Sequence, residues 1–515
     1  MRNSSRSVTN FLFLTALFAV AYTQAPLYTS NQNQYFLHGL AHAGVGYLRQ
    51  DWLANTLDPT PVFSLLVSVT YTLFASEVVF YVYYALQMGV YLFSLLGIVA
   101  TVFDIHSERS LYLVFLALLV TAHSAALRFA LARALGANWT YVFEDGVADQ
   151  RLLGSVFEPS TFSVLLVFSI YLFLAGRPLW AVLAAVLAAT FHPTYLLSAA
   201  VLTLAYAWTA LREAGGRRGL LKALLIGTLA LAAVSPILFY VYTNFANTPA
   251  DTTAQARQIL VDFRIPHHAR VAWWFDATAI VKILLVSAGL ALARRTRLFP
   301  VLLFSTAAAV GLTILQLVLN HDALALIFPW RLSIYLVPIS TAALLAYLVT
   351  ALGRSYPSLA VRYRRSLTGA SLILLGLVVL IGGIRFVLDL QRKANAEDRP
   401  VMAYVAAHSA PGEIYLIPVK MQDFRLAAGS PAFVDFKSIP YRDSDVLEWY
   451  RRLQLTDRFY KQNDCSLLQQ LAREEGITHV VLRSEQFGLQ CPALNQLYRD
   501  SHYGVYTLGG RAQAP

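Results

Sequence analysis

Side chains that could do acid–base chemistry gather in the first long polar interruption of the chain, residues 31–61, which we call the first polar stretch. It follows the first apolar run directly and mixes aromatic residues with titratable ones, namely His38, His42, Arg49, Asp51 and Asp58. A carboxylate beside a membrane and shielded by aromatic rings can have a pKa raised towards neutrality, which suits a general base. The alternative interpretation is a solvated loop whose Trp and Tyr side chains anchor at the membrane surface.

The two carboxylates of the first polar stretch have different expected roles. Asp51 and Asp58 are seven residues apart and would share one face of a continuous helix, but Pro59 and Pro61 favour a helix end near Asp58. We therefore expect Asp58 to form a turn before Pro59. Asp51 is the predicted catalytic carboxylate, and His38 and Asp58 are predicted to contact substrate.

A second polar stretch, residues 128–161, contains an acidic pair. Glu144 and Asp145 are adjacent in the sequence.

Basic groups that could bind a phosphate follow later in the chain. Arg264, His267 and His268 lie in residues 244–278, and Arg331 begins an apolar run. Such groups form charge-assisted hydrogen bonds to phosphate, so all four are predicted to contact an anionic substrate. The alternatives are an interfacial loop and, for Arg331, a side chain that reaches to the membrane surface. Adjacent histidines match no common zinc spacing, and the sequence leaves a divalent metal open as a cofactor.

The whole chain has the composition of a membrane protein. It is 57% hydrophobic and 13% charged, with a mean hydropathy of +0.54, whereas a soluble domain is about half apolar and a quarter charged. The net charge of +11 is explained by Lys and Arg of cytoplasmic loops, so we expect no nucleic-acid partner. The sequence contains no P-loop, dinucleotide fingerprint, HExxH or GxSxG with triad partners, so ATP-driven transport and common hydrolase chemistry have no support.

The order of apolar runs and basic loops predicts the topology. Even numbers of apolar runs separate three basic loops, so all three can be cytoplasmic; they lie at residues 212–222, 294–297 and 354–365. Arg2 and Arg6 place the N-terminus on the same side, which requires that one early run does not span. We assign this role to residues 62–76, with 179–190 as the alternative. About 11 spans then remain, and the C-terminus lies outside the cytoplasm.

The composition changes near residue 390. Residues 1–390 are the predicted transmembrane domain, with outer loops at 24–61, 128–161 and 244–278, and residues 391–515 are a predicted extracytoplasmic α/β domain. Residues 413–418 and 477–482 read as strands and 431–436 as a weaker one, while 445–452 and 466–475 have helical spacing with Gly476 as a C-cap. Cys465 and Cys491 both fall in this domain. The sequence is compatible with a disulfide between them and with two free thiols.

The architecture and the acidic positions resemble the GT-C superfamily of membrane glycosyltransferases. The resemblance covers nearly the whole chain: an acidic residue in the loop after the first span, many spans and an extracytoplasmic α/β tail. Asp51, in the sequence RQDW, stands alone where the family usually has an acidic pair, and Glu144-Asp145 looks like its second acidic motif. The resemblance therefore implies that Glu144 and Asp145 are catalytic residues as well.

This resemblance implies a function. It implies a multi-pass protein of the bacterial inner membrane that transfers a sugar, with inversion, from a polyprenyl-phosphate donor to an extracytoplasmic acceptor that the sequence does not identify. Membrane lipid and the lipid-linked donor are the implied partners. The alternatives are a transporter or flippase of lipid-linked saccharide, a surface-polysaccharide polymerase or ligase, and a receptor whose C-terminal domain binds a ligand.

Overall fold

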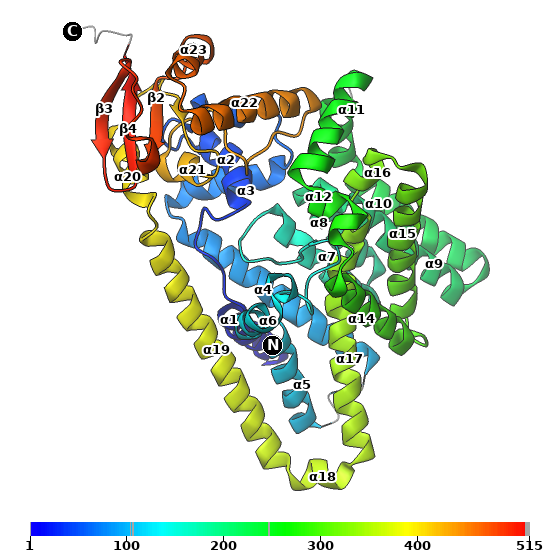
Figure 1. Cartoon of the computed structure of the whole chain (residues 1–515). Helices are drawn as coiled ribbons and strands as arrows, with labels where there is room; N and C mark the ends of the chain where they lie inside the picture. The colour runs from blue at the N-terminus through cyan, green and yellow to red at the C-terminus, as the bar shows by residue number, and fades with distance from the viewer. Residues whose placement is uncertain (1, 104, 106–107, 246–247, 510–515) are drawn as a thin grey trace. The chain divides into compact units, whose positions relative to one another are not determined.

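The computed structural model describes residues 2–103, 105, 108–245 and 248–509. The side chains of Arg2 and Arg6, and residues 510–515 of the predicted C-terminal domain, lie outside what it describes. The chain is mostly helical and carries one small sheet near its C-terminus (Figure 1). It divides into two compact units, each considered by itself. Unit 1 comprises residues 1–24, 80–242 and 260–388, and unit 2 comprises residues 25–79, 243–259 and 389–515.

Unit 1 is built from apolar helices. Among the described residues, six helices are long and apolar enough to cross a membrane, and a seventh span is possible if the bent pair α5–α6 is counted as one. The helices of unit 1, some of which run into unit 2 at one end, are α1 (Arg2–Tyr22), α4 (Val78–Val102), α5 (Arg109–Ala122), α6 (Ala125–Leu135), α7 (Val164–Leu174), α8 (Pro178–Phe191), α9 (Leu196–Ala214), α10 (Gly216–Phe245), α12 (Pro266–Ala269), α13 (Val271–Trp274), α14 (Ala277–Ala293), α15 (Leu298–Leu319), α16 (Asp322–Leu326), α17 (Ser333–Ser355), α18 (Pro357–Arg362) and α19 (Arg364–Ala394). The chain is thus an integral membrane protein.

The bend between α5 and α6 has a local cause. The two helices meet at 54°, and Ser124 between them caps α6, its hydroxyl accepting a hydrogen bond from the Leu127 N–H at 3.2 Å. A capping serine starts a new helix rather than continuing the old one. The bend directs the chain into the second polar stretch.

The number of spans stays a prediction. About 11 spans would require the bent pair and all but one of the shorter apolar helices to cross. The run at residues 62–76, predicted not to span, forms the short helix α3 (Pro61–Phe74), which belongs to unit 2.

Unit 2 contains a mixed four-stranded sheet in the order β1-β2-β4-β3, with β1 parallel to β2 and the other pairs antiparallel. Its elements are α2 (Gln32–Ala43), α3, α11 (Ala250–Gln258), α20 (Arg399–His408), β1 (Tyr415–Leu416), α21 (Phe424–Ala428), α22 (Asp443–Gln462), α23 (Cys465–Glu475), β2 (His479–Arg483), β3 (Leu494–Arg499) and β4 (Tyr503–Leu508). Successive residues of β2 face opposite sides. Val480 packs with Trp449 of α22, while Val481 packs with Phe424 of α21. Helices therefore cover both faces of the sheet.

The first polar stretch belongs to the same unit. Helix α2 ends at Gly44, whose φ of +79° is the left-handed conformation that favours glycine. The Arg49 guanidinium then donates to the Ala41 and His42 carbonyls at 2.9 and 2.8 Å. These bonds satisfy the end of the helix and fold the chain back over it.

The predicted fold class is confirmed as a mostly helical membrane protein with a small C-terminal sheet region. The range 413–418 contains β1, and 477–482 overlaps β2 (His479–Arg483). Both predicted helices form, with Gly476 as C-cap of the second. The strand expected at 431–436 was wrong, because only an isolated bridge between Tyr415 and Ala432 forms there. Cys465 and Cys491 form a disulfide. The boundary of a soluble domain at 390 stays a prediction.

Candidate functional site

The acidic pair Glu144–Asp145 is buried in unit 1. It lies in the loop that joins α6 to the short helix η4 (Pro159–Ser163), and the two residues are only 4% and 2% exposed. Buried carboxylates need cations or hydrogen-bond donors, since an isolated buried charge is unstable. The groups around this pair therefore determine whether the two carboxylates can be stable there.

Three cations surround the pair. Arg128 of α6 lies 3.4 Å from Glu144, and Arg151 lies 3.5 Å from Asp145. Lys282 of α14 is buried and donates a 2.8 Å hydrogen bond to the Gly146 carbonyl. The cluster thus joins two helices to the second polar stretch.

One oxygen of each carboxylate accepts no hydrogen bond from the described residues. Within residues 2–103, 105, 108–245 and 248–509, neither Glu144 Oε2 nor Asp145 Oδ1 has a hydrogen-bond partner. Burial raises the pKa of Glu144 to about 8, with Arg128 opposing the shift. Burial also raises the pKa of Asp145 to about 6, with Arg151 and Lys282 opposing it. Buried acceptors without donors are uncommon in folded proteins, so they mark a place for a ligand donor.

Ser333 holds the loop against the start of α17. Its hydroxyl accepts a hydrogen bond from the Val147 N–H at 2.8 Å. A Cβ at Gly146 would lie 2.4 Å from that hydroxyl oxygen and 2.9 Å from the Ile334 nitrogen. Only glycine permits this close approach, which fixes the position of Asp145 beside it.

Arg331 lies against the same loop. Its Nε donates to Gln150 Oε1 at 2.7 Å, and one terminal nitrogen donates to the Thr194 hydroxyl. The guanidinium also lies 4.9 Å from the centre of the Phe328 ring. Guanidinium carries five N–H donors, so these two bonds leave further donors for an anion.

His268 is positioned by the second polar stretch. Its Nδ1 lies 2.8 Å from the Ala148 carbonyl, which makes Nδ1 the protonated nitrogen. Burial, followed by the nearby His267, lowers the pKa of His268 to about 3, so at neutral pH the ring is uncharged. The His267 ring centre is 4.1 Å away, and Arg264, in the π-helix η6 (Ile259–Arg264), is buried.

The structure thus brings together Glu144, Asp145, Arg331 and His268 around the second polar stretch. Arg128 and Lys282 were not among the predicted site residues. For Lys282 the signal is a charged side chain inside an otherwise apolar run, which is costly unless the residue has a partner. Arg128 stands at the start of the second polar stretch and gives no such signal.

Asp51 lies elsewhere, in the interior of unit 2. It is fully buried, and its Oδ2 accepts hydrogen bonds from Arg425 Nε at 2.7 Å and from the Ala432 N–H at 2.9 Å. Its Oδ1 accepts from the Leu53 N–H at 2.8 Å. Arg425 also pairs with the buried Asp435. In this arrangement both carboxylate oxygens of Asp51 are hydrogen-bonded within unit 2, and its catalytic role stays a prediction.

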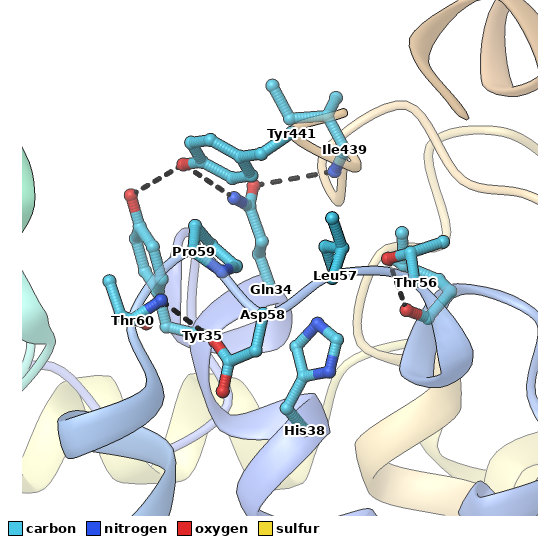
Figure 2. Close-up of a pocket in the computed structure, with 11 residues that line it drawn as sticks. Gln34, Tyr35, His38, Thr56, Leu57, Asp58, Pro59, Thr60, Ile439 and Tyr441 are labelled. Carbon is cyan, nitrogen blue, oxygen red and sulfur yellow. Dashed lines mark hydrogen bonds between the residues drawn. The ribbon is translucent and has the colours of Figure 1, made fainter. Parts of the chain in front are cut away.

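His38 and Asp58 line a small pocket in unit 2 (Figure 2). Asp58 Oδ1 accepts a hydrogen bond from the Thr60 N–H at 2.8 Å, which is the turn expected before Pro59. His38 is 7% exposed. Both predicted substrate-binding residues of the first polar stretch therefore face one cavity.

In the part of the chain that the structure describes, no three His, Cys, Asp or Glu side chains are grouped so that they could hold a metal ion together.

Comparisons with known proteins give one partial family match and several distant structures. Residues 396–456 match a family model described as a domain of unknown function, DUF6798. A search of curated proteins finds no match. The matched segment lies in unit 2 and includes Arg425 and Asp435, the partners of the Asp51 network.

Among solved structures, the chain is similar to ArnT from Cupriavidus metallidurans. The crystal structure of ArnT bound to undecaprenyl phosphate matches with 13% identity and a TM-score of 0.44, over 99% of this chain and 98% of that one. Its apo state matches with 14% identity and a TM-score of 0.48, over 99% and 100%. The archaeal oligosaccharyltransferase AglB from Archaeoglobus fulgidus, in complex with an inhibitory peptide and a dolichol-phosphate, matches with 14% identity and a TM-score of 0.38, over 93% and 69%.

Proposed function

We propose that this chain is a GT-C-type membrane glycosyltransferase that transfers a sugar from a polyprenyl-phosphate donor to an extracytoplasmic acceptor hydroxyl. The observation that carries the proposal is the buried Glu144–Asp145 pair, with one unpartnered oxygen on each residue among the described atoms and Arg331 against the same loop. Such a cluster at the ends of apolar helices suits a substrate that has a lipid tail, a phosphate and a hydroxyl partner.

Asp145 is the proposed general base. With a pKa of about 6 it is ionised at neutral pH, whereas Glu144, with a pKa of about 8, is mostly protonated. Asp145 takes the proton of the acceptor hydroxyl as the hydroxyl oxygen attacks the anomeric carbon. The bond from that carbon to the phosphate oxygen breaks, and the configuration inverts. The polyprenyl phosphate leaves with the bonding electrons.

Arg331 is the proposed phosphate ligand. Its remaining N–H donors can neutralise the charge that develops on the leaving phosphate. The neutral His268 donates a hydrogen bond from Nδ1–H to the Ala148 carbonyl, so its proposed role is to position the loop. Arg264 and His267 are proposed as secondary contacts, and the site is proposed to open on the outer face of a bacterial inner membrane.

A transporter of lipid-linked saccharide is the second candidate, because Arg128 and Lys282 are charged residues within apolar helices. Both, however, contact the loop at residues 144–146 rather than one another. This arrangement favours a fixed site at the ends of the helices over a charged pathway through them.

The experiment is a donor assay on the full-length protein in lipid nanodiscs. Undecaprenyl phosphate, the lipid of the ArnT structure named above, is tested for binding by native mass spectrometry. Synthetic undecaprenyl-phosphate sugars are then incubated with the protein and membrane extract, and released lipid phosphate is measured. Binding of the lipid phosphate, together with release that requires Asp145, supports the proposal. Lipid-phosphate binding with saccharide movement across the bilayer but no release would favour the transporter, and absence of binding would overturn both.

A further inference from the structure

Three helix turns of unit 1 lie together at one end of its helices. They join α7 to α8, α9 to α10 and α14 to α15, at residues 175–177, 215 and 294–297. Helix α9 packs against α15 (Figure 1) and against α8, which in turn packs against α7. The Arg297 guanidinium contacts both other hairpins: it donates to Glu213 Oε2 at 2.9 Å and lies 5.0 Å from the centre of the Phe173 ring. The three turns therefore form one surface.

Glycine makes the turn between α9 and α10 tight. Gly215 and Gly216 have φ of +60° and +46°, the left-handed conformation that favours glycine. Gly219 packs against the end of α9, because a Cβ there would lie 2.6 Å from the Leu211 carbonyl oxygen. The turn thus places the two basic residues in the first turn of α10 beside the end of α9.

The surface formed by the three turns, which we call the basic surface, carries a large excess of positive charge. Within residues 175–180, 211–222 and 293–298, all of which the structure describes, Glu213 is the one acidic residue, and it already pairs with Arg297. The basic residues of these ranges, all exposed except the half-buried Arg297, are Arg177, Arg212, Arg217, Arg218, Lys222, Arg294, Arg295 and Arg297. Like charges that lie close together repel one another, so an anion against this surface would be stabilised.

Aromatic and apolar side chains border the basic surface. Trp180 and Trp208 are exposed, and so are Leu220 and Leu221 of α10. The Arg212 guanidinium lies 4.5 Å from the centre of the Trp208 ring. Exposed tryptophans beside arginines at the ends of apolar helices are typical of the level where lipid headgroups meet hydrocarbon. An anion at that level is the phosphate of a membrane lipid.

We propose that the basic surface binds the headgroup of an anionic phospholipid. Arginine forms paired hydrogen bonds to phosphate, which suits this headgroup better than a diffuse charge would. Any basic loop beside a membrane attracts anionic lipid weakly. The basic surface differs from the loop at residues 354–365 because its arginines come from three turns that contact one another. The proposal does not depend on sugar transfer, since neither the acidic pair nor Arg331 belongs to this surface.

Native mass spectrometry of the full-length protein, purified in detergent and freed of lipid, tests the proposal. The protein is titrated with dioleoyl phosphatidylglycerol, and dioleoyl phosphatidylcholine is the zwitterionic comparison. The wild-type protein is expected to retain phosphatidylglycerol in preference. Arg217→Gln combined with Arg218→Gln should bind it about 30-fold more weakly, since each basic residue near an anionic surface contributes about a factor of five. Arg294→Gln combined with Arg295→Gln should give the same loss from a different turn, which decides the outcome if the first variant does not fold.

The matched control is Arg364→Gln combined with Arg365→Gln, because both residues are exposed in the same unit and the same charge is removed. It should bind phosphatidylglycerol like the wild type. No preference for phosphatidylglycerol, or an equal loss in the control, would overturn the proposal in favour of general attraction between basic loops and lipid. Displacement of the bound lipid by inorganic phosphate would overturn it in favour of a free-phosphate site. Each readout is binding of a lipid without a sugar, so failure here is separate from failure of the proposed function.

Discussion

Arg425 and Asp51, 374 residues apart in the chain, form a buried ion pair in which the guanidinium Nε lies 2.7 Å from the carboxylate oxygen. The same guanidinium pairs with Asp435 and donates to the Ala432 carbonyl at 2.8 Å. Breaking a buried pair by removing one partner is strongly destabilising. Asp51 is thus a residue of the interior of unit 2, and this placement gives the first prediction.

Asp51→Ala should lower the free energy of unfolding of unit 2. We expect about 3 kcal/mol, the lower end of the range for a broken buried pair, because Asp435 still pairs with Arg425. Pulse proteolysis of the C-terminal segment measures the change. Asp457→Ala, which removes an exposed pair with Lys461, is the control and should cost less than about 1 kcal/mol. If the Asp51→Asn protein is stable and binds donor but transfers no sugar, Asp51 is the general base instead.

Asp145→Asn should lower sugar transfer by about 10²–10⁴, the usual cost of a lost general base. Because the pKa of Asp145 is about 6, wild-type activity should rise as the pH increases through about 6. Asp149 is exposed in the same loop with φ +52°, a conformation that Asn tolerates. Asp149→Asn should therefore retain activity. If Asp145→Asn and Asp149→Asn lose activity equally, Asp145 is not the general base.

Glu144→Gln should stabilise the protein increasingly as the pH rises. The folded-state pKa of about 8 lies above the ordinary value of 4.5, so folding favours the protonated acid. The contribution of Glu144 to the free energy of unfolding is fully present below pH 4.5 and is lost as the pH rises through 8. The Tm difference between variant and wild type should grow between these values. Glu474→Gln, at an exposed position, is the matched control. A Tm difference that does not change with pH for Glu144→Gln would contradict the raised pKa of Glu144.

Arg331→Ala should weaken binding of undecaprenyl phosphate about 10- to 100-fold, as for loss of a hydrogen bond to a charged group. Native mass spectrometry or a lipid-competition assay measures this change. Arg270, which pairs with Asp262 and Asp322 on the surface of the same unit, gives the matched control Arg270→Ala. If both variants bind the lipid phosphate like the wild type, Arg331 does not contact it.

Reduction of the Cys465–Cys491 disulfide should destabilise unit 2 by roughly 3 kcal/mol, the chain-entropy estimate for a loop of this size; the two cysteines are 26 residues apart. Denatured, unreduced protein should react with no thiol reagent. Cys465→Ser combined with Cys491→Ser should reproduce the stability of the reduced protein. Two reactive thiols in protein taken from the membrane would refute the bridge.

Structural features that depend only on neighbouring residues could be predicted from the sequence. The apolar runs, the turn at Asp58 and the cap at Gly476 each depend on residues within a few positions of one another, so one stretch of sequence contains the whole cause. The sequence predicts outer loops at residues 128–161 and 244–278, and His268 and Arg331 do contact Ala148 and Gln150 beside the acidic pair. The pairing of individual atoms did not follow.

The remaining features depend on distant partners. No sequence signal near Asp51 indicates Arg425, and the aromatic neighbours of Asp51 favour a catalytic role instead. The β3–β4 hairpin was not predicted, because β3 lies at the edge of the sheet and most of its side chains are exposed or half-buried. An edge strand with little burial lacks the apolar alternation that reveals a strand.

Unit 2 is assembled from segments at both ends of the chain, and this imposes an order on biosynthesis. Asp51 leaves the ribosome long before Arg425; at about 5–20 residues per second the interval is roughly 20–75 seconds. During that time the Asp51 carboxylate has no Arg425, and the first polar stretch cannot complete its fold. A ribosome that stalls within the last membrane helices would leave this stretch open to proteases and chaperones. Final protection of residues 31–61 should therefore coincide with the emergence of residues 425–435.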